Sequence, residues 1–181
     1  QKVIMVGCDA HDKSLLVKIG VGRQTPVKRS FANTESGRGA MKKVLKDKAK
    51  EFGAGRIVFA YEASCHGFGL YDELRDAGIE CYVLAPTKIA RSTKQKKHKT
   101  DERDAEDILE LLRGHVLAGN RLPSVWVPDR QTRDDRDLVR ARLDLRKKVT
   151  ALKAQVRSLL KRNIIKKPLG LGQGWTRAYL G

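Results

Sequence analysis

The sequence lacks the features of secreted and membrane proteins. Its 181 residues contain no apolar run long enough to cross a bilayer and no apolar leader segment. The three cysteines, Cys8, Cys65 and Cys81, are odd in number and have no CxxC spacing, which argues against a disulfide framework. We therefore expect a protein of the reducing cytoplasm without a membrane partner.

A zinc site is a weak alternative use of these cysteines. Cys65, His66 and Cys81 carry suitable ligand atoms, but their spacing matches no familiar zinc site. Cys8 and Cys81 lie in apolar segments, where burial of a small side chain explains each of them.

Acidic and aromatic residues are also in short supply. The 21 acidic residues face 38 Lys and Arg, and the formal charge of +17 favours a polyanionic partner, with nucleic acid as the first candidate. A cationic surface without a specific ligand is the alternative. Aromatic residues make up only 6%, so stacking on single-stranded bases is not the expected main mode of binding. We expect Trp126 and Trp175 to anchor the chain locally.

The order of apolar segments predicts an α/β fold with a mixed sheet and flanking helices. Residues 3–9, 14–21 and 26–31 have the pattern of three successive strands with turn-forming breaks, which indicates an antiparallel meander. Helix and strand patterns then alternate, which indicates parallel strands joined by crossover helices. These patterns cover a helix within 35–55, a strand at 56–62, a helix at 69–78, a strand at 80–85 and a helix at 101–119.

Four acidic residues occupy special places in this layout. Asp9 ends the first strand and Glu62 ends the fourth, while Asp101 and Asp104 stand three apart on one face of a helix start. Carboxylates are suitable ligands for Mg²⁺ or Mn²⁺. Two such ions about 3.5 to 4 Å apart are a standard device for cleaving phosphodiesters. We therefore predict a site with two ions, held by Asp9, Glu62, Asp101 and Asp104.

Ordinary structural roles are the alternative for these acids. Thr100 or Asp101 suits the N-cap of the last helix, and acids in a first turn are favoured by the helix dipole. Asp9 suits a turn with His11, and Glu62 suits the cap of the helix that follows it. Spacing alone leaves both interpretations open, but the strand order favours the metal site because it is the layout of the ribonuclease-H-like nucleases.

Two basic regions are expected to contact nucleic acid phosphates. Residues 87–99 contain six Lys or Arg and no acid, and residues 130–167 contain 14 Lys and Arg against 4 acids, a net charge of +10. The candidate contact residues are Lys88, Arg91, Lys94, Lys96, Lys97, Lys99, Arg130, Arg133, Arg140, Arg146, Lys147 and Lys148.

The second basic region also carries a heptad pattern. Apolar residues recur at steps of three and four, which favours a long helix that pairs as a coiled coil. An amphipathic helix packed on its own domain is the alternative, and Arg142 at a seam position weakens the coiled-coil interpretation. The predicted dimerisation seam consists of Leu138, Leu145, Val149, Leu152, Val156 and Leu159.

The sequence closely resembles the N-terminal half of the insertion sequence 110 family of transposases, the DEDD transposases, which also include the pilin-gene invertases. The resemblance runs from VGCDAHDKSL to GWTRAYL, and KTDERDA with YEAS upstream and VWVPD downstream is specific to that family. One departure is CHG at 65–67, where relatives often have smaller residues. The roles of His11 and His66 stay open, with His66 expected to face solvent.

The resemblance implies a catalytic domain similar to the Holliday-junction resolvases at 1–120, a linker at 121–129, a coiled-coil helix at 130–165 and, at 166–181, the start of a connection to a further domain. In the family, the DEDD acids correspond to Asp9, Glu62, Asp101 and Asp104. The further domain carries a serine that attacks DNA, and a structured bridge RNA pairs donor and target DNA. The chain ends near GWTRAYLG, where that domain would begin, so we expect a fragment without the nucleophilic serine.

Three functions remain in view. The first is the metal-binding half of a transposase or recombinase that acts on DNA with a guide RNA and as a homo-oligomer. The second is an autonomous resolvase-type nuclease that needs only the four acids. The third is a non-catalytic RNA-binding and dimerisation module in which the acids serve as helix caps.

Overall fold

The computed structural model describes residues 2–64, 67–88, 100–166 and 175. Cys65, His66, Arg91, Lys94, Lys96, Lys97 and Lys99 lie outside the described residues, as does the side chain of Lys88. The chain divides into two compact units, 1–127 and 128–181, and the described residues of each are presented by themselves. No helix in the described ranges is both long and apolar enough to span a membrane.

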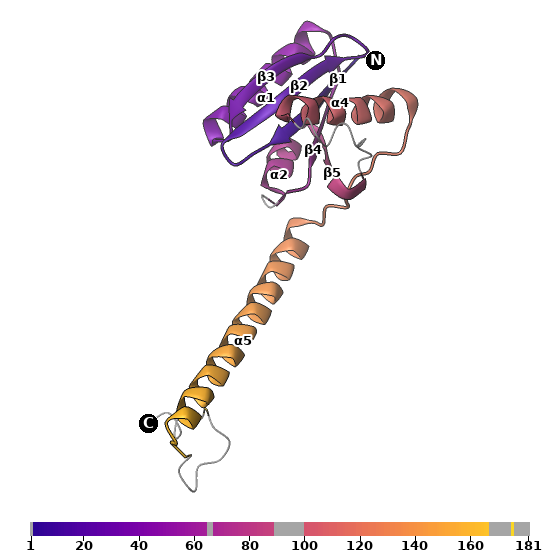
Figure 1. The fold of residues 1–181 in the computed structure, drawn as a ribbon. Coiled ribbons are helices and arrows are strands. Elements are labelled where there is room, and N and C mark those ends of the chain that lie inside the picture. The colour runs from indigo at the N-terminus through magenta and orange to yellow at the C-terminus, as the bar shows by residue number, and fades with distance from the viewer. Residues whose placement is uncertain (1, 65–66, 89–99, 167–174, 176–181) are drawn as a thin grey trace. The chain divides into compact units, whose positions relative to one another are not determined.

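The first unit is built on a five-stranded sheet with strand order β3-β2-β1-β4-β5 (Figure 1). The neighbours β3, β2 and β1 are antiparallel, whereas β1, β4 and β5 are parallel. This is the predicted meander followed by crossover units, and it confirms the ribonuclease-H-like mixed sheet. The strands are β1 (Val3–Ala10), β2 (Ser14–Val21), β3 (Val27–Ala32), β4 (Arg56–Glu62) and β5 (Glu80–Leu84).

Three α-helices cover the two faces of this sheet. On one face, Met41 and Leu45 of α1 and Leu74 of α2 share a buried core with β1, β2, β4 and β5. On the other face, Ile108, Leu109 and Leu112 of α4 pack in a second core. The helices of this unit are α1 (Glu35–Glu51), α2 (Gly69–Asp76), the 3-10 turn η1 (Pro86–Lys88) and α4 (Asp101–Ala118). All three α-helices lie within the predicted segments.

The strand alternation of β1 assigns its side chains to these two cores. Ile4, Val6 and Cys8 face α1, while Met5 belongs to the core under α4. Gly7 follows Met5 on the α4 face, and a Cβ added there would lie 2.2 Å from the carbonyl oxygen of Ala105 and 2.5 Å from the amide nitrogen of Leu109. The missing side chain therefore lets the backbone of α4 lie directly on β1.

The segment after α4 forms backbone contacts with β5 at the edge of the sheet. Ser124 bridges Leu84 at the edge of the sheet, and the amide of Val125 donates to the carbonyl of Val83 (2.8 Å). Because side chains alternate along an extended segment, Val125 and Val127 pack against the core, whereas Trp126 is 72% exposed. The two valines thus pack this segment onto the core, and an anchoring role for Trp126 stays a prediction.

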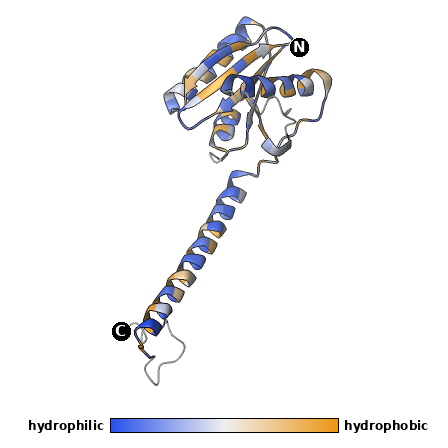
Figure 2. Cartoon of the chain, in the orientation of Figure 1, coloured by the Kyte–Doolittle hydropathy of each residue, from blue (hydrophilic) through white to orange (hydrophobic). Residues whose placement is uncertain are grey.

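The second unit contains α5 (Arg130–Arg162), a 33-residue helix on which hydrophilic residues predominate (Figure 2). Asp129 caps it by accepting a hydrogen bond from the amide of Thr132 (2.8 Å). The six residues of the predicted seam are 40–71% exposed. Lys153 and Arg157 lie over the ring of Trp175, 5.5 and 5.7 Å from its centroid. The long helix is confirmed, while its pairing stays a prediction.

The contact between Gly7 and α4 predicts a large effect for Gly7→Ala. The new methyl group would meet backbone atoms that cannot rotate away, so we expect the free energy of unfolding to fall by about 2–3 kcal/mol or more. Chemical denaturation followed by circular dichroism would measure it.

Gly39→Ala is the matched control, because Gly39 lies within α1 and an added Cβ meets nothing within 4 Å. Helix propensity predicts that this change raises stability by about 1 kcal/mol. Equal effects of the two substitutions would contradict the close contact of α4 with β1.

Candidate metal centre

The parallel pairing of β1 with β4 brings Asp9 and Glu62 to neighbouring strand ends. Cys8 pairs with Tyr61, so the next residue along each strand is one of the two acids. Asp9 follows Met5 and Gly7 on the α4 face, and Glu62 follows Val58 and Ala60, which belong to the core under α4. Both acids are therefore placed at the same edge and on the same face of the sheet.

The start of α4 lies on this face and supplies the other two acids. Thr100 is the N-cap, and its hydroxyl accepts a hydrogen bond from the amide of Arg103 (3.4 Å). Asp101 and Asp104 follow in the first turn; the side chain of Asp101 is 61% exposed, whereas Asp104 is only 8% exposed. The helix start thus presents one accessible carboxylate and one buried carboxylate.

Asp9, His11 and Asp101 form a close cluster. His11 Nε2 lies 3.1 Å from Asp9 Oδ2 and 3.5 Å from Asp101 Oδ1. One potential ligand atom from each of the three residues lies within 4.8 Å of the other two. Residues 92 positions apart in the sequence therefore converge on a space of the size of an ion site.

The electrostatics of Asp9 show that Asp104 also acts at this place. Burial, the largest cause, raises the pKa of Asp9 above its ordinary value. His11 opposes this shift, whereas the negative charges of Asp101 and Asp104 add to it. The charges of Asp101 and Asp104 thus disfavour the ionised form of Asp9, and a bound cation would favour it.

The predicted four acids are therefore brought together to different degrees. Asp9 and Asp101 meet, Asp104 is close enough to shift the pKa of Asp9, and Glu62 lies at the end of the strand next to Asp9. His11 is the member that the sequence left undecided. Its signal was the spacing of two residues from Asp9, but its position depends on the turn in which its amide donates to the carbonyl of Ser14 (2.9 Å).

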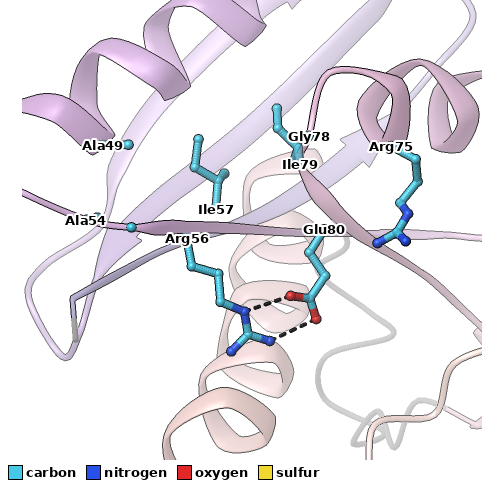
Figure 3. Close-up of a pocket in the computed structure, with 9 residues that line it drawn as sticks. Ala49, Ala54, Arg56, Ile57, Arg75, Gly78, Ile79 and Glu80 are labelled. Carbon is cyan, nitrogen blue, oxygen red and sulfur yellow. Dashed lines mark hydrogen bonds and ion pairs between the residues drawn. The ribbon is translucent and has the colours of Figure 1, made fainter.

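A groove at the opposite strand ends is separate from these acids (Figure 3). It lies where β4 and β5 begin, and Arg56 there donates to both carboxylate oxygens of Glu80 at 2.7 and 2.9 Å. Tyr82 donates to the same carboxylate at 2.6 Å. Glu80 is therefore held by its neighbours and stands at the wrong end of its strand to join the cluster.

The sequence profile of the insertion sequence 110 DEDD transposases matches residues 6–165. The chain belongs to this transposase family. The transposase-like protein y4qE of Sinorhizobium fredii is 36% identical over 138 residues. This match covers 76% of this chain and 33% of that protein. The transposase for insertion sequence element IS1533 of Leptospira borgpetersenii is 29% identical over 113 residues, 62% of this chain and 32% of that protein. The chain thus spans about a third of the length of these curated relatives.

Solved structures of RuvC from Thermus thermophilus are also similar to this transposase-family chain. One is a complex with a Holliday junction substrate, at 11% identity and a TM-score of 0.43, and covers 68% of this chain and 99% of its own. A second RuvC structure from the same organism gives 10% identity and the same TM-score, over 67% and 99% of the two chains. The strand order and directions given above carry the fold assignment.

The raised pKa of Asp9 predicts an unusual effect of Asp9→Asn. A carboxyl whose pKa is higher in the folded than in the unfolded chain costs stability above that folded pKa, and the cost disappears as the pH falls below the unfolded value. Asp9→Asn should therefore keep or raise the free energy of unfolding at neutral pH with a chelator present, instead of lowering it by the ~1 kcal/mol typical of a substitution. The difference should shrink in acid.

Glu80→Gln is the control of opposite sign. Arg56 lowers the pKa of Glu80, with smaller contributions from its other partners, against the effect of burial. Its charged form therefore stabilises the fold at neutral pH, and Glu80→Gln should lower the unfolding free energy. Denaturant titrations at several pH values test both variants, and a loss of stability in Asp9→Asn at neutral pH would contradict the raised pKa of Asp9.

Proposed function

We propose that this chain is the metal-binding part of a DNA transposase or site-specific recombinase of a mobile genetic element, and that its acids take part in DNA strand cleavage and exchange. The supporting observation is the convergence of Asp9 and Asp101, with His11, inside a chain of the transposase family. Asp9, Glu62, Asp101 and Asp104 are the proposed catalytic and metal-binding residues. Membership of the transposase family suggests the class of reaction, and the cluster of acids suggests that the reaction uses a metal ion.

The donor set fits Mg²⁺ or Mn²⁺. Asp9 and Asp101 offer hard carboxylate oxygens, which these ions prefer, and the partly buried Asp9 gains most from a nearby positive charge. Two bound ions would activate the attacking oxygen of a phosphodiester exchange and stabilise the leaving oxygen. Glu62 and Asp104 would complete the ligand set from the next strand and the next helical position.

The chain's own residues prepare the site for this role. His11 is within hydrogen-bonding distance of Asp9, which orients that carboxylate toward Asp101. Asp101 and Asp104 lie in the first turn of α4, where the helix dipole adds a positive partial charge. Together these groups hold carboxylates in position before a cation or a phosphate arrives.

The remaining parts of the reaction are proposed from the family. The attacking serine would come from the part of the relatives that this chain does not cover, and a structured bridge RNA would pair donor and target DNA. Arg130, Arg133, Arg140, Arg146, Lys147 and Lys148 all lie on α5, which has no buried residue. We propose that they contact nucleic acid phosphates and that Lys88, Arg91, Lys94, Lys96, Lys97 and Lys99 do the same.

The metal site is tested by calorimetric titration of Mg²⁺ and Mn²⁺ into the 181-residue chain, with and without duplex DNA. We expect saturable binding that tightens with DNA, because phosphate oxygens complete the coordination of the ions. Asp104→Asn keeps the size of the buried side chain and removes its charge, and should weaken binding at least about tenfold.

Asp47→Asn is the matched control, since Asp47 is an exposed acid on α1, a helix of the opposite face. Its metal binding should equal that of the wild type. If no heat depends on Asp104, with or without DNA, the acids do not form a metal centre, and a binding and dimerisation module becomes the better explanation.

We also propose that α5 pairs with a second copy through the predicted seam, in a dimer or a larger homo-oligomer. The seam leaves six large apolar side chains exposed along one helix, a pattern that pairing would bury. The double change Leu145→Lys and Leu152→Lys should weaken self-association at least tenfold in sedimentation equilibrium.

Leu143→Lys provides the control for charge and lost apolar area, because Leu143 is 50% exposed and stands off the seam. It should leave association nearly unchanged. A wild-type chain that stays monomeric at the highest usable concentration, or equal losses in the seam and off-seam variants, would exclude the coiled-coil pairing.

A further inference from the structure

A buried lysine lies beside the first turn of α4. Lys18 stands in the middle of β2, opposite Gly7 of β1 in the antiparallel register, and its side chain is only 8% exposed. Burying an ammonium group is costly unless a counter-charge accompanies it. Glu102 supplies that charge with its Oε1 2.7 Å from Lys18 Nζ, and Glu106 Oε2 lies 3.6 Å away.

A second lysine completes an ion-pair bridge on the same carboxylate. Lys28 of β3 pairs with Lys18 across the two strands, so two like charges stand side by side. Glu102 Oε2 accepts from Lys28 Nζ at 2.5 Å, which places one carboxylate between both ammonium groups. One partly exposed carboxylate on α4 is therefore paired with lysines from both β2 and β3.

The bridge fixes how α4 is turned about its axis. Successive helical residues are about 100° apart, so Glu102, Glu106 and Arg113 form one stripe of the helix. This stripe faces β2 and the turn after it, because Arg113 Nη2 donates to the carbonyl of Gln24 at 2.5 Å. Asp101 and Asp104 lie on other sides of the helix, and their directions follow from the anchoring of this stripe.

The bridge also opposes the repulsion among the metal-binding acids. The carboxylates of Asp9 and Asp101 both lie within 3.5 Å of His11 Nε2, so their like charges repel each other, and separating them would require the first turn of α4 to move away from the sheet. That turn contacts the sheet through Glu102, whose two partners come from β2 and β3. Loss of the bridge would leave the acids free to separate.

We propose that Lys18, assisted by Lys28, is a positioning residue that acts through Glu102 to set Asp101 and Asp104 against Asp9 for metal binding. This inference rests on the proposed metal centre. Neither lysine nor Glu102 is a proposed ligand, so their effect on an ion is indirect. Supporting groups behind metal ligands commonly change metal affinity by about 10- to 100-fold.

The test is Lys18→Met, with Mn²⁺ affinity measured by calorimetry in the 181-residue chain. We expect at least a tenfold weaker affinity. Glu102→Gln should lower the Mn²⁺ affinity by a similar factor. The double variant should bind Mn²⁺ no more weakly than the single variant with the lower affinity, because both changes remove the same interaction. Lys28→Met, which removes the outer partner only, should give a smaller loss.

Lys42→Met is the matched control for lost stability. Lys42 Nζ lies 2.6 Å from Glu73 Oε1 in a partly buried ion pair that joins α1 to α2 on the other face of the sheet. Its loss should lower the unfolding free energy and leave Mn²⁺ affinity unchanged. Equal losses of affinity in Lys42→Met and Lys18→Met would reduce the bridge to an ordinary stabilising contact and overturn the proposal.

The outcomes separate this proposal from the metal centre itself. Asp104-dependent binding in the wild type together with normal affinity in folded Lys18→Met and Glu102→Gln variants refutes the positioning role and leaves the metal centre standing. Absence of Asp104-dependent binding in the wild type refutes both. If Lys18→Met does not fold, which circular dichroism would show, Glu102→Gln and Lys28→Met decide by the same criterion.

Discussion

The contact of α4 with β1 at Gly7 is the constraint on which the rest of the site depends. Backbone atoms of Ala105 and Leu109 occupy the space that any side chain would need, so the helix lies closer to the sheet than side-chain packing alone would permit. Asp101, in the first turn of the same helix, lies in one cluster with Asp9 of β1 and with His11. A backbone contact in the core thus helps to determine the distance between carboxylates that are far apart in the sequence.

The placement of acids around Asp9 lowers the stability of the fold while it forms the proposed metal centre. Burial, with smaller contributions from the charges of Asp101 and Asp104, raises the pKa of Asp9, so the ionised form of Asp9 opposes the fold that places it there. The apolar contacts of Ile108, Leu109 and Leu112 and the ion pairs of Glu102 hold α4 in place against that repulsion. Sites that concentrate like charges commonly depend on such support from surrounding structure.

The sequence predicted most of the fold because its signals are local. Alternation in the strands and glycine at the helix ends give the element order, and the order gives the positions of Asp9 and Glu62 at strand ends. His11, Lys18 and Trp126 were beyond such reasoning for one shared reason. The direction of each side chain is decided by contacts with a distant segment: a turn for His11, α4 for Lys18 and the edge of β5 for Trp126.

The charge of the chain and the charge of the site have opposite signs, and the two act over different distances. The net charge of +17 attracts a polyanion over roughly the Debye length, about 8–10 Å at physiological salt. At shorter range the carboxylates of Asp9 and Asp101 repel a phosphate. The net charge of the protein would therefore attract a nucleic acid backbone, whereas these two acids would repel it. A divalent cation removes this conflict because it attracts both the carboxylates and the phosphate. If the proposed metal centre binds both a cation and nucleic acid, the two should strengthen each other's binding, since each ligand offsets the charge that opposes the other.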